Sequence, residues 1–298
     1  MDSSLRLPLA TLRRSALLAL LALPAAAAQP APAAAAAVPV PAVPMAPGPE
    51  QCQPLPALRS PIAFAPGELL EFSLDAMGAE AGKMTMRVLP RKDGALPVEA
   101  RVQTNTFFSK VRRVKGVAMS YLHPRTLRPL RHTEETVENE KPRSVNVVFG
   151  EKDRSVKVDY RMGGARGRHD YRYLHDGLDV AGTLYVLRQL PLKEGLSLCF
   201  DVYGVRRMWR MTGTVLKREH VSLPLGEFDA WHLSGTAVRV DKPSQRREVH
   251  VWITDDARRL PLAAVGTVDL GAVRATLTGF ARPGEAPRRA EGKEDMKW

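Results

Sequence analysis

The sequence predicts a mainly β protein, built as an antiparallel curved sheet, a half-barrel or an open barrel, with one short inserted helix. Three observations predict this fold. Apolar and polar residues alternate with a period of two through much of residues 59–281, which is typical of strands with one buried face. Turn-forming residues separate these runs. A single stretch near residue 180 has helical spacing instead.

The clearest hairpin lies at the centre of the chain. Apolar side chains alternate over residues 145–149 and again over 156–160, and Gly150-Glu151-Lys152-Asp153 between them favours a turn. The same alternation predicts further strands at residues 69–74, 84–88, 98–108, 114–122, 208–216, 231–240, 249–253, 262–267 and 273–277. Because no break in composition divides these strands, they predict one domain with one sheet.

The helix begins after Asp179, a residue type that caps helix N-termini. Val180, Leu184 and Leu187 then follow at helical spacing, and Pro191 ends the pattern. We therefore expect one short helix that separates two sets of strands.

The N-terminus predicts a secretory signal peptide over residues 1–28. Three arginines precede an apolar run at residues 16–23, and an Ala-x-Ala cleavage site lies at residues 26–28. The run is too short for a permanent membrane helix, and no later run reaches the ~18 apolar residues that a span requires. We expect an exported protein, periplasmic or extracellular, with no transmembrane span in its mature form.

Composition divides the remaining chain into three parts. Residues 29–58 are mostly Ala, Pro and Val, which predicts a disordered, semi-rigid spacer. The spacer is either a tether or a linker without a specific partner. Residues 59–281 form the single β-rich domain, and residues 282–298 predict a disordered charged tail because they lack periodicity.

The chain is basic, and most of its positive charge comes from arginine. Lys and Arg number 44 against 32 Asp and Glu, a net charge of +12, and loss of residues 1–28 leaves 41 minus 31, or +10. Arginine binds phosphate and carboxylate in a bidentate manner. The candidate anion-binding residues are Arg112, Arg113, Arg206, Arg207, Arg246 and Arg247. They predict an anionic lipid or cell-envelope polymer as partner, unless the charges only solvate outward strand positions. Nucleic acid is not expected as a partner, because the protein is predicted to be exported and its sequence has no recognised nucleic-acid-binding motif.

The chain has two cysteines, Cys52 and Cys199. In an oxidising compartment two cysteines commonly pair, which predicts a disulfide between residues 147 positions apart. The alternative is a buried Cys199 and a free thiol at Cys52.

Local motifs for catalysis or metal binding are missing. The seven histidines show no His-x-His or His-Glu-x-x-His spacing, and no Gly-x-Ser-x-Gly elbow is present. We therefore nominate no catalytic, cofactor-binding or metal-binding residue, and expect a protein that is not an enzyme. An envelope-polymer hydrolase with dispersed catalytic groups is the alternative, and it would bring together at least two of His169, His175, Asp176 and Asp201.

Four short motifs resemble one known family. They are Pro61-Ile62-Ala63-Phe64-Ala65-Pro66-Gly67-Glu68-Leu69-Leu70-Glu71-Phe72, Asp176-Gly177-Leu178-Asp179-Val180 with Leu184-Tyr185-Val186-Leu187-Arg188, Leu223-Pro224-Leu225-Gly226-Glu227-Phe228-Asp229-Ala230-Trp231, and Trp252-Ile253-Thr254-Asp255-Asp256-Ala257-Arg258-Arg259-Leu260-Pro261-Leu262. Their order resembles the bacterial family called domain of unknown function 3108. The resemblance implies export and a β-rich fold, and it implies no activity and no catalytic residues.

These observations combine into one expectation and two alternatives. We expect a non-enzymatic envelope protein whose curved sheet holds a lipid or another amphiphile on an apolar concave face, with arginines at the rim. The first alternative is the hydrolase. The second is a structural or assembly partner that reaches another protein through residues 29–58. The sequence carries no signal for the oligomeric state.

Overall fold

The protein is described from a computed structural model over residues 52–204, 206–268 and 271–291. The predicted signal peptide and most of the predicted spacer lie outside these residues. The strands are β1 (Leu69–Ala76), β2 (Ala79–Val88), β3 (Leu96–Thr104), β4 (Val114–Leu122), β5 (Pro129–Glu138), β6 (Lys141–Phe149), β7 (Ser155–Met162), β8 (Ala165–Arg172), β9 (Gly177–Asp179), β10 (Ser197–Gly204), β11 (Arg207–Leu223), β12 (Gly226–Arg239), β13 (Arg246–Thr254), β14 (Pro261–Val268), β15 (Gly271–Ala281) and β16 (Arg288–Arg289). The helices are the 3₁₀ turn η2 (Phe108–Lys110) and α1 (Val180–Leu187).

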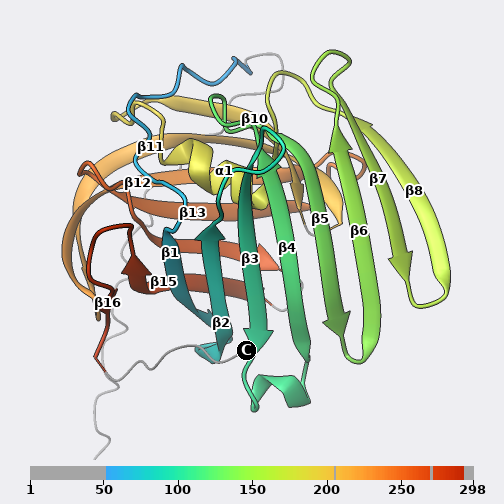
Figure 1. Cartoon of the computed structure of the whole chain (residues 1–298), viewed down its shortest axis with the longest axis horizontal. Helices are drawn as coiled ribbons and strands as arrows, with labels where there is room; N and C mark the ends of the chain where they lie inside the picture. Colours follow the sequence, from blue (N-terminus) through green and yellow to red (C-terminus); the bar gives the residue numbers. More distant parts are fainter. Residues whose placement is uncertain (1–51, 205, 269–270, 292–298) are drawn as a thin grey trace, which may run out of the picture. The chain divides into compact units, whose positions relative to one another are not determined.

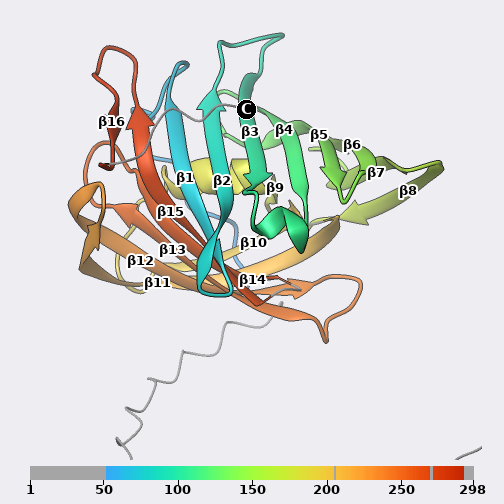
Figure 2. The same cartoon turned by 90° about the horizontal axis from the view of Figure 1, so that it is seen from below.

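All sixteen strands of the described residues belong to one sheet. Two antiparallel meanders, one from β1 to β8 and the other from β15 back to β10, meet where β1 pairs with β15. The first meander ends at β8 and the second at β9, which pairs in parallel with β10. Figures 1 and 2 show the two meanders crossing with α1 between them. The sheet is open and largely antiparallel, which confirms the predicted fold class.

The sheet is rolled so that its β9–β10 end lies inside the curve of β5–β8. Alternate residues of β10 show this. Phe200 and Val202 pack in the cluster that contains α1, whereas Tyr203 packs on Val147 and Val158 of β6 and β7. The first cluster is called the inner core. The second, called the outer core, consists of Val145, Val147, Phe149, Val156, Val158, Tyr173, Tyr203 and Met208.

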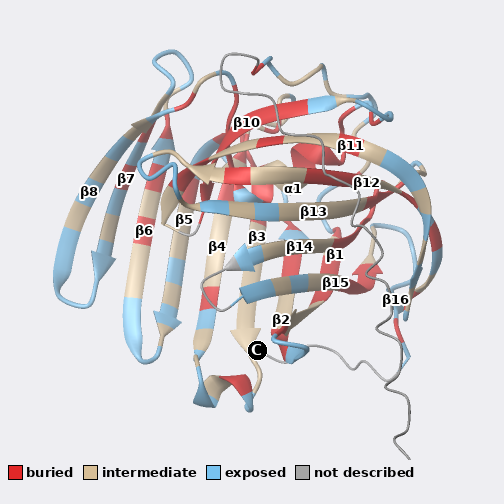
Figure 3. Cartoon of the chain, turned by 180° about the vertical axis from the view of Figure 1, so that it is seen from behind, coloured by how far each residue is buried: buried red, intermediate tan, exposed pale blue. Residues whose placement is uncertain are grey.

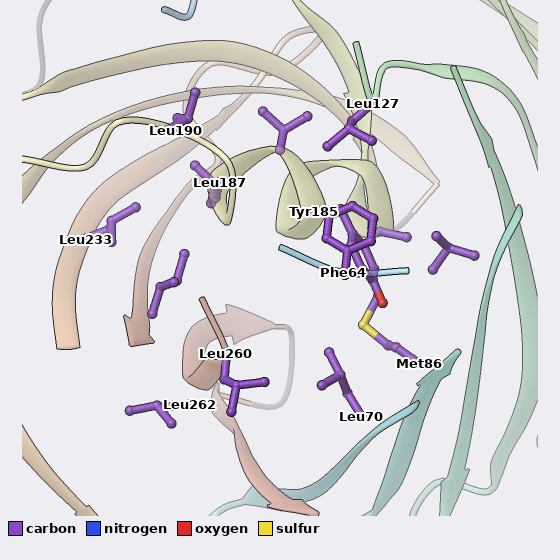
Figure 4. Close-up of a cluster of buried hydrophobic side chains, with 14 of the residues drawn as sticks. Phe64, Leu70, Met86, Leu127, Tyr185, Leu187, Leu190, Leu233, Leu260 and Leu262 are labelled. Atoms are coloured by element: carbon purple, nitrogen blue, oxygen red, sulfur yellow. The ribbon is translucent and has the colours of Figure 1, made fainter. Parts of the chain in front are cut away.

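The inner core fills the concave face of the sheet with the protein's own side chains. Figure 4 shows Tyr185 and Leu187 of α1 among side chains from several strands and loops. Tyr185 meets Phe64 edge-on, with ring centroids 4.4 Å apart. Both side chains are buried, as are Leu70 and Leu260. The helix therefore occupies the region of the concave face that the sequence predicts for an amphiphile.

A buried ion pair fixes the end of α1. Arg188 donates from Nη1 to Glu68 Oε1 over 2.6 Å and from Nη2 to Oε2 over 2.9 Å, and both side chains are inaccessible to solvent. Its Nε donates to the carbonyl of Arg259 over 2.8 Å. Burial alone would lower the pKa of Arg188, but Glu68 raises it. One guanidinium thus joins α1 to β1 and to the turn before β14.

The local predictions are largely confirmed. Asp179 caps α1 by accepting from the Gly182 amide over 2.6 Å, and the central hairpin pairs Val147 with Val158. The predicted strand over 98–108 is too long, because β3 ends at Thr104. The Asn105 carboxamide there accepts from the Phe108 amide over 2.8 Å, which turns the chain into η2.

The structure differs from the predicted domain limits at both ends. Residues 52–58 belong to the folded unit, because Cys52 is buried and the Leu55 amide donates to Asp176 Oδ2 over 2.9 Å. Residues 282–291 of the predicted disordered tail are placed against the domain. Arg289 of β16 pairs with Glu71 of β1 at 2.7 Å. A charged residue of the predicted disordered tail thus forms an ion pair with a distant strand.

Candidate functional site

Charged side chains gather where the two ends of the rolled sheet meet. We call this place the seam: it lies where β5 and β6 face β9 and the turn between β10 and β11. Its inner part consists of His132, Glu134, Arg143 and Asp179, and its solvent-facing part consists of Arg112, Glu138 and Arg206. These residues come from five separate segments, so only the rolled fold brings them together.

His132 ties β5 to the start of α1. Its Nδ1 lies 3.0 Å from Asp179 Oδ2, while the other oxygen of Asp179 caps the helix. Its Nε2 lies 4.0 Å from Glu134 Oε2. Burial alone would lower the pKa of His132, but hydrogen bonds and attraction to these two carboxylates raise it to about 9. The imidazole is therefore a buried cation at neutral pH.

Glu134 and Arg143 complete the inner part of the seam. Arg143 donates from Nη1 to Glu134 Oε1 over 3.0 Å. Burial would raise the pKa of Glu134, yet His132 and the guanidinium groups of Arg143 and Arg206 lower it. The carboxylate remains ionised and neutralises the cations around it.

The solvent-facing part holds two arginines on one carboxylate. Arg112 Nη2 lies 2.5 Å from Glu138 Oε1, and Arg206 pairs with the other oxygen of Glu138. Their side chains are 34% and 40% exposed. Arg113 beside them is 60% exposed and contacts Glu140 at 3.7 Å. Two guanidinium groups per carboxylate leave a local excess of positive charge within reach of solvent.

The other predicted anion-binding residues lie at neighbouring strand ends. Arg207 begins β11 and lies 3.9 Å from Asp241. Arg246 and Arg247 begin β13, and the Arg247 guanidinium lies 4.5 Å from the centroid of the Trp209 ring. The structure therefore joins Arg112 to Arg206 through Glu138, and places the other four at the starts of β4, β11 and β13.

A disulfide joins Cys52, in the segment before β1, to Cys199 of β10. Cys52 and Cys199 are bonded with their Cα atoms 5.4 Å apart, so the chain before β1 is held to β10. Both sulfurs are buried.

The residues named for a hydrolase meet only in part. Asp176 and Asp201 are neighbours, since the Asp201 amide donates to the Asp176 carbonyl over 2.9 Å. Both carboxylates are buried, however, and each pairs with its own arginine, Arg128 and Arg210. The remaining two do not join them: His175 is exposed, and the His169 ring stacks on Tyr160 in the β7–β8 hairpin. This arrangement holds the chain together and exposes no paired carboxylates.

A second set of residues resembles a catalytic triad by type alone. Ser120 is the cross-strand partner of His132, which contacts Asp179. Ser120 is 1% exposed, and its hydroxyl has no hydrogen-bond partner. The other ring nitrogen of His132, Nε2, lies 4.0 Å from Glu134 Oε2 and not against the serine. The serine therefore does not meet substrate or a base, and the histidine serves the fold. No spacing in the sequence joins these three residues, so sequence reasoning missed them.

The sheet also carries a cavity and a pair of histidines. The cavity, about 530 Å³, lies at β3–β6, and its lining includes Arg101, Lys115 and Glu135 as well as Arg143 of the seam. On β12 and β13, His232 Nε2 lies 3.0 Å from His250 Nδ1. Over the described ranges, no group of three or more His, Cys, Asp or Glu side chains is placed to hold a metal ion. Likewise, no helix there is long and apolar enough to cross a membrane.

The solved structures that resemble this chain include one that shares its fold. A β-barrel-like protein of the domain of unknown function DUF1849 from Brucella abortus matches with a TM-score of 0.52 at 8% identity, over 74% of this chain and 100% of that one. A candidate exported protein with a YmcC-like fold from Bacteroides fragilis matches with a TM-score of 0.29 at 9% identity, over 72% and 95%. The hypothetical protein CT021 from Chlamydia trachomatis matches with a TM-score of 0.33 at 8% identity, over 78% and 95%. The first match shows a β-barrel-like fold.

The sequence itself places the chain in one family. The model of the family described as protein of unknown function (DUF3108) matches residues 71–278. This match covers more than half of the 298 residues. The protein is a member of the DUF3108 family, which confirms the resemblance seen in its motifs. None of the curated proteins matches it.

Proposed function

We propose that this protein is a non-enzymatic binding module of the cell envelope, exported by its signal peptide, that binds an anionic component through the arginines of the seam. The observation that carries the proposal is the convergence of Arg112 and Arg206 on Glu138. Both arginines are exposed enough to reach a ligand, and their shared carboxylate neutralises only one of them. Arg113 follows Arg112 in the sequence and Arg207 follows Arg206, so each of the two arginines has a second arginine next to it.

The ligand chemistry we propose is a phosphate or carboxylate group. Arginine presents a planar fork of donors that matches either group. A lipid headgroup and an acidic envelope polymer both carry such groups. The proposal assigns no acyl chain to the concave face, because α1 and the inner core occupy it.

Binding to vesicles and to a soluble polymer tests the proposal. We expect the mature protein to sediment with vesicles that contain phosphatidylglycerol, or to bind polyphosphate, and to ignore pure phosphatidylcholine. Each arginine near an anionic surface contributes about 1 kcal/mol. Arg112→Ser with Arg206→Ser should therefore weaken binding by about 30-fold at low salt.

The matched control removes equal charge elsewhere. Arg87 and Arg91 are exposed residues of β2 and the following turn. Arg87→Ser with Arg91→Ser should weaken binding by no more than about threefold, because the charge of the seam is intact. Vesicle binding without polyphosphate binding assigns a headgroup, and the reverse assigns a polymer. Equal losses in the two double variants, or no binding by the wild type, would refute a site at the seam.

A further inference from the structure

The two end strands of the sheet, β9 and β8, differ in length and in burial. β9 has three residues, all buried, and it lies inside the rolled sheet. β8 has eight residues, and all of them are exposed or half-buried. In the described part of the chain, no strand pairs with the outer side of β8. Figure 1 shows β8 at the margin of the sheet, and Figure 3 shows its exposed surface.

The backbone of β8 is ready to accept another strand. Met162 pairs with Ala165 across the two-residue turn Gly163-Gly164, and the register between β7 and β8 runs without a bulge. Beyond β8, the Tyr173 amide donates to the Arg154 carbonyl over 3.1 Å. In an antiparallel ladder, alternate residues bond to the same neighbour. The residues whose amides and carbonyls point away from β7 are therefore Arg166, Arg168, Asp170 and Arg172.

The positive charge along the edge of β8 favours an added strand that carries acidic side chains. The same four residues share one face with Lys157, Asp159 and Arg161 of β7. That face carries five cationic and two acidic side chains, a net charge of 5 minus 2, or +3. Residues on an added strand would lie directly opposite the arginines of β8, where opposite charges attract and like charges repel.

The other face of β8 selects the alternate residues of the occupant. Here the His169 ring stacks on Tyr160 with centroids 5.2 Å apart, and Tyr171 lies half-buried nearby. An added strand would place every second side chain beside these rings. Apolar or aromatic residues suit those positions.

We propose that the outer edge of β8 is a docking site for an extended segment of a partner protein in which acidic and apolar residues alternate, added as one more antiparallel strand. Exposed edges bind partners in this way through backbone hydrogen bonds. A second copy of β8 does not fit this role. In every antiparallel register that pairs these outward-facing residues with each other and overlaps by five residues or more, at least one arginine lies opposite an arginine.

A pair of variants separates backbone pairing from charge. Proline at position 168 removes an amide that faces outward and leaves the ladder with β7 intact. Arg168→Ala removes the same charge and keeps the amide. The probe is a capped peptide of alternating Glu and Val, and a peptide with the same residues in two blocks is its control. We expect Arg168→Pro to weaken binding of the alternating peptide at least tenfold, and Arg168→Ala to weaken it about two- to threefold.

Amide hydrogen exchange gives an independent readout on the wild-type protein. The peptide should slow exchange at least tenfold at Arg166, Arg168, Asp170 and Arg172. Equal affinities of the two variants, equal binding of the block peptide, or unchanged exchange at these amides would overturn the proposal. A wild-type dimer that Arg168→Pro dissociates would also overturn it, by assigning the edge to a second copy. If Arg168→Pro does not fold, Arg166→Pro with Arg166→Ala repeats the comparison.

Discussion

The inner core and the seam bury charge in different ways. In the inner core, Arg188 and Glu68 are both inaccessible, and two parallel hydrogen bonds match one cation to one carboxylate. At the seam, Glu138 serves two arginines, and exposure increases outward from the buried His132. This difference distinguishes charges that stabilise the fold from charges that are available to bind a ligand. A pair whose charges balance and that lacks contact with water is structural, whereas shared and half-exposed arginines retain binding capacity.

The largest effect should come from breaking the balanced pair of the inner core. Glu68→Ala leaves Arg188 buried without a counter-charge, which typically costs 3–5 kcal/mol, so we expect a loss of about 4 kcal/mol in the free energy of unfolding. Urea denaturation measures it. Glu68→Ala with Arg188→Met removes both charges and should recover at least half of the loss. A loss below about 1 kcal/mol in the single variant would show that the pair is not what holds α1.

Removal of the disulfide should have the next largest effect. Cys52→Ala with Cys199→Ala frees the segment before β1 from β10 and should lower the free energy of unfolding by about 2–4 kcal/mol. For a domain of this size the melting temperature should fall by roughly 5–15 °C. A reductant should destabilise the wild type by a similar amount and leave the double variant unchanged. If the reductant shifts both proteins equally, its effect does not come from this bond.

Local features of the fold could be predicted because they depend on neighbours in sequence. The Asp179 cap, the end of the helix before Pro191 and the hairpin that pairs Val147 with Val158 all follow from spacing and turn chemistry. The resemblance to the family depends on similar short motifs. In each case the signal lies within about a dozen residues.

The inner core and the seam were out of reach because the rolled fold assembles them. Arg188 and Glu68 are 120 residues apart, and His132 and Asp179 are 47 apart. In the sequence, Arg188 is one arginine among many, and nothing marks it as buried. Periodicity shows that a strand has one apolar face. It does not show that both faces of β10 are buried, one in the inner core and the other in the outer core. The helix filling the concave face was missed for the same reason.

The charge of His132 should make the seam weaken at alkaline pH. The pKa of His132 rises from an ordinary 6.5 to about 9 in the fold because of Asp179 and Glu134. Its stabilisation is therefore complete below about pH 6.5 and is lost as pH rises through about 9. Burial raises the pKa of Tyr203, whose ring packs against His132, so this side chain stays neutral in the folded protein over the same range. We expect the free energy of unfolding to fall by about 2–3 kcal/mol between pH 6.5 and 10.

The control for this pH dependence is His132→Gln, which cannot carry the charge. The variant should be less stable than the wild type at pH 6.5, and its stability should change by less than about 1 kcal/mol over the same range. Parallel pH profiles of the two proteins, recorded by urea denaturation, would assign the titration to another group.

The smallest effect should come from the exposed ion pair of the β7–β8 hairpin. Arg168 Nε lies 3.1 Å from Asp159 Oδ1, and the two side chains are 63% and 55% exposed. Water and salt screen such a pair, so a double-mutant cycle with Arg168→Ala and Asp159→Ala should give a coupling below about 1 kcal/mol. The value should fall further in 0.5 M salt. A coupling as large as that of Arg188 and Glu68 would mean that β8 is held as firmly as the inner core, and an edge held by its own charges would have little capacity for a partner strand.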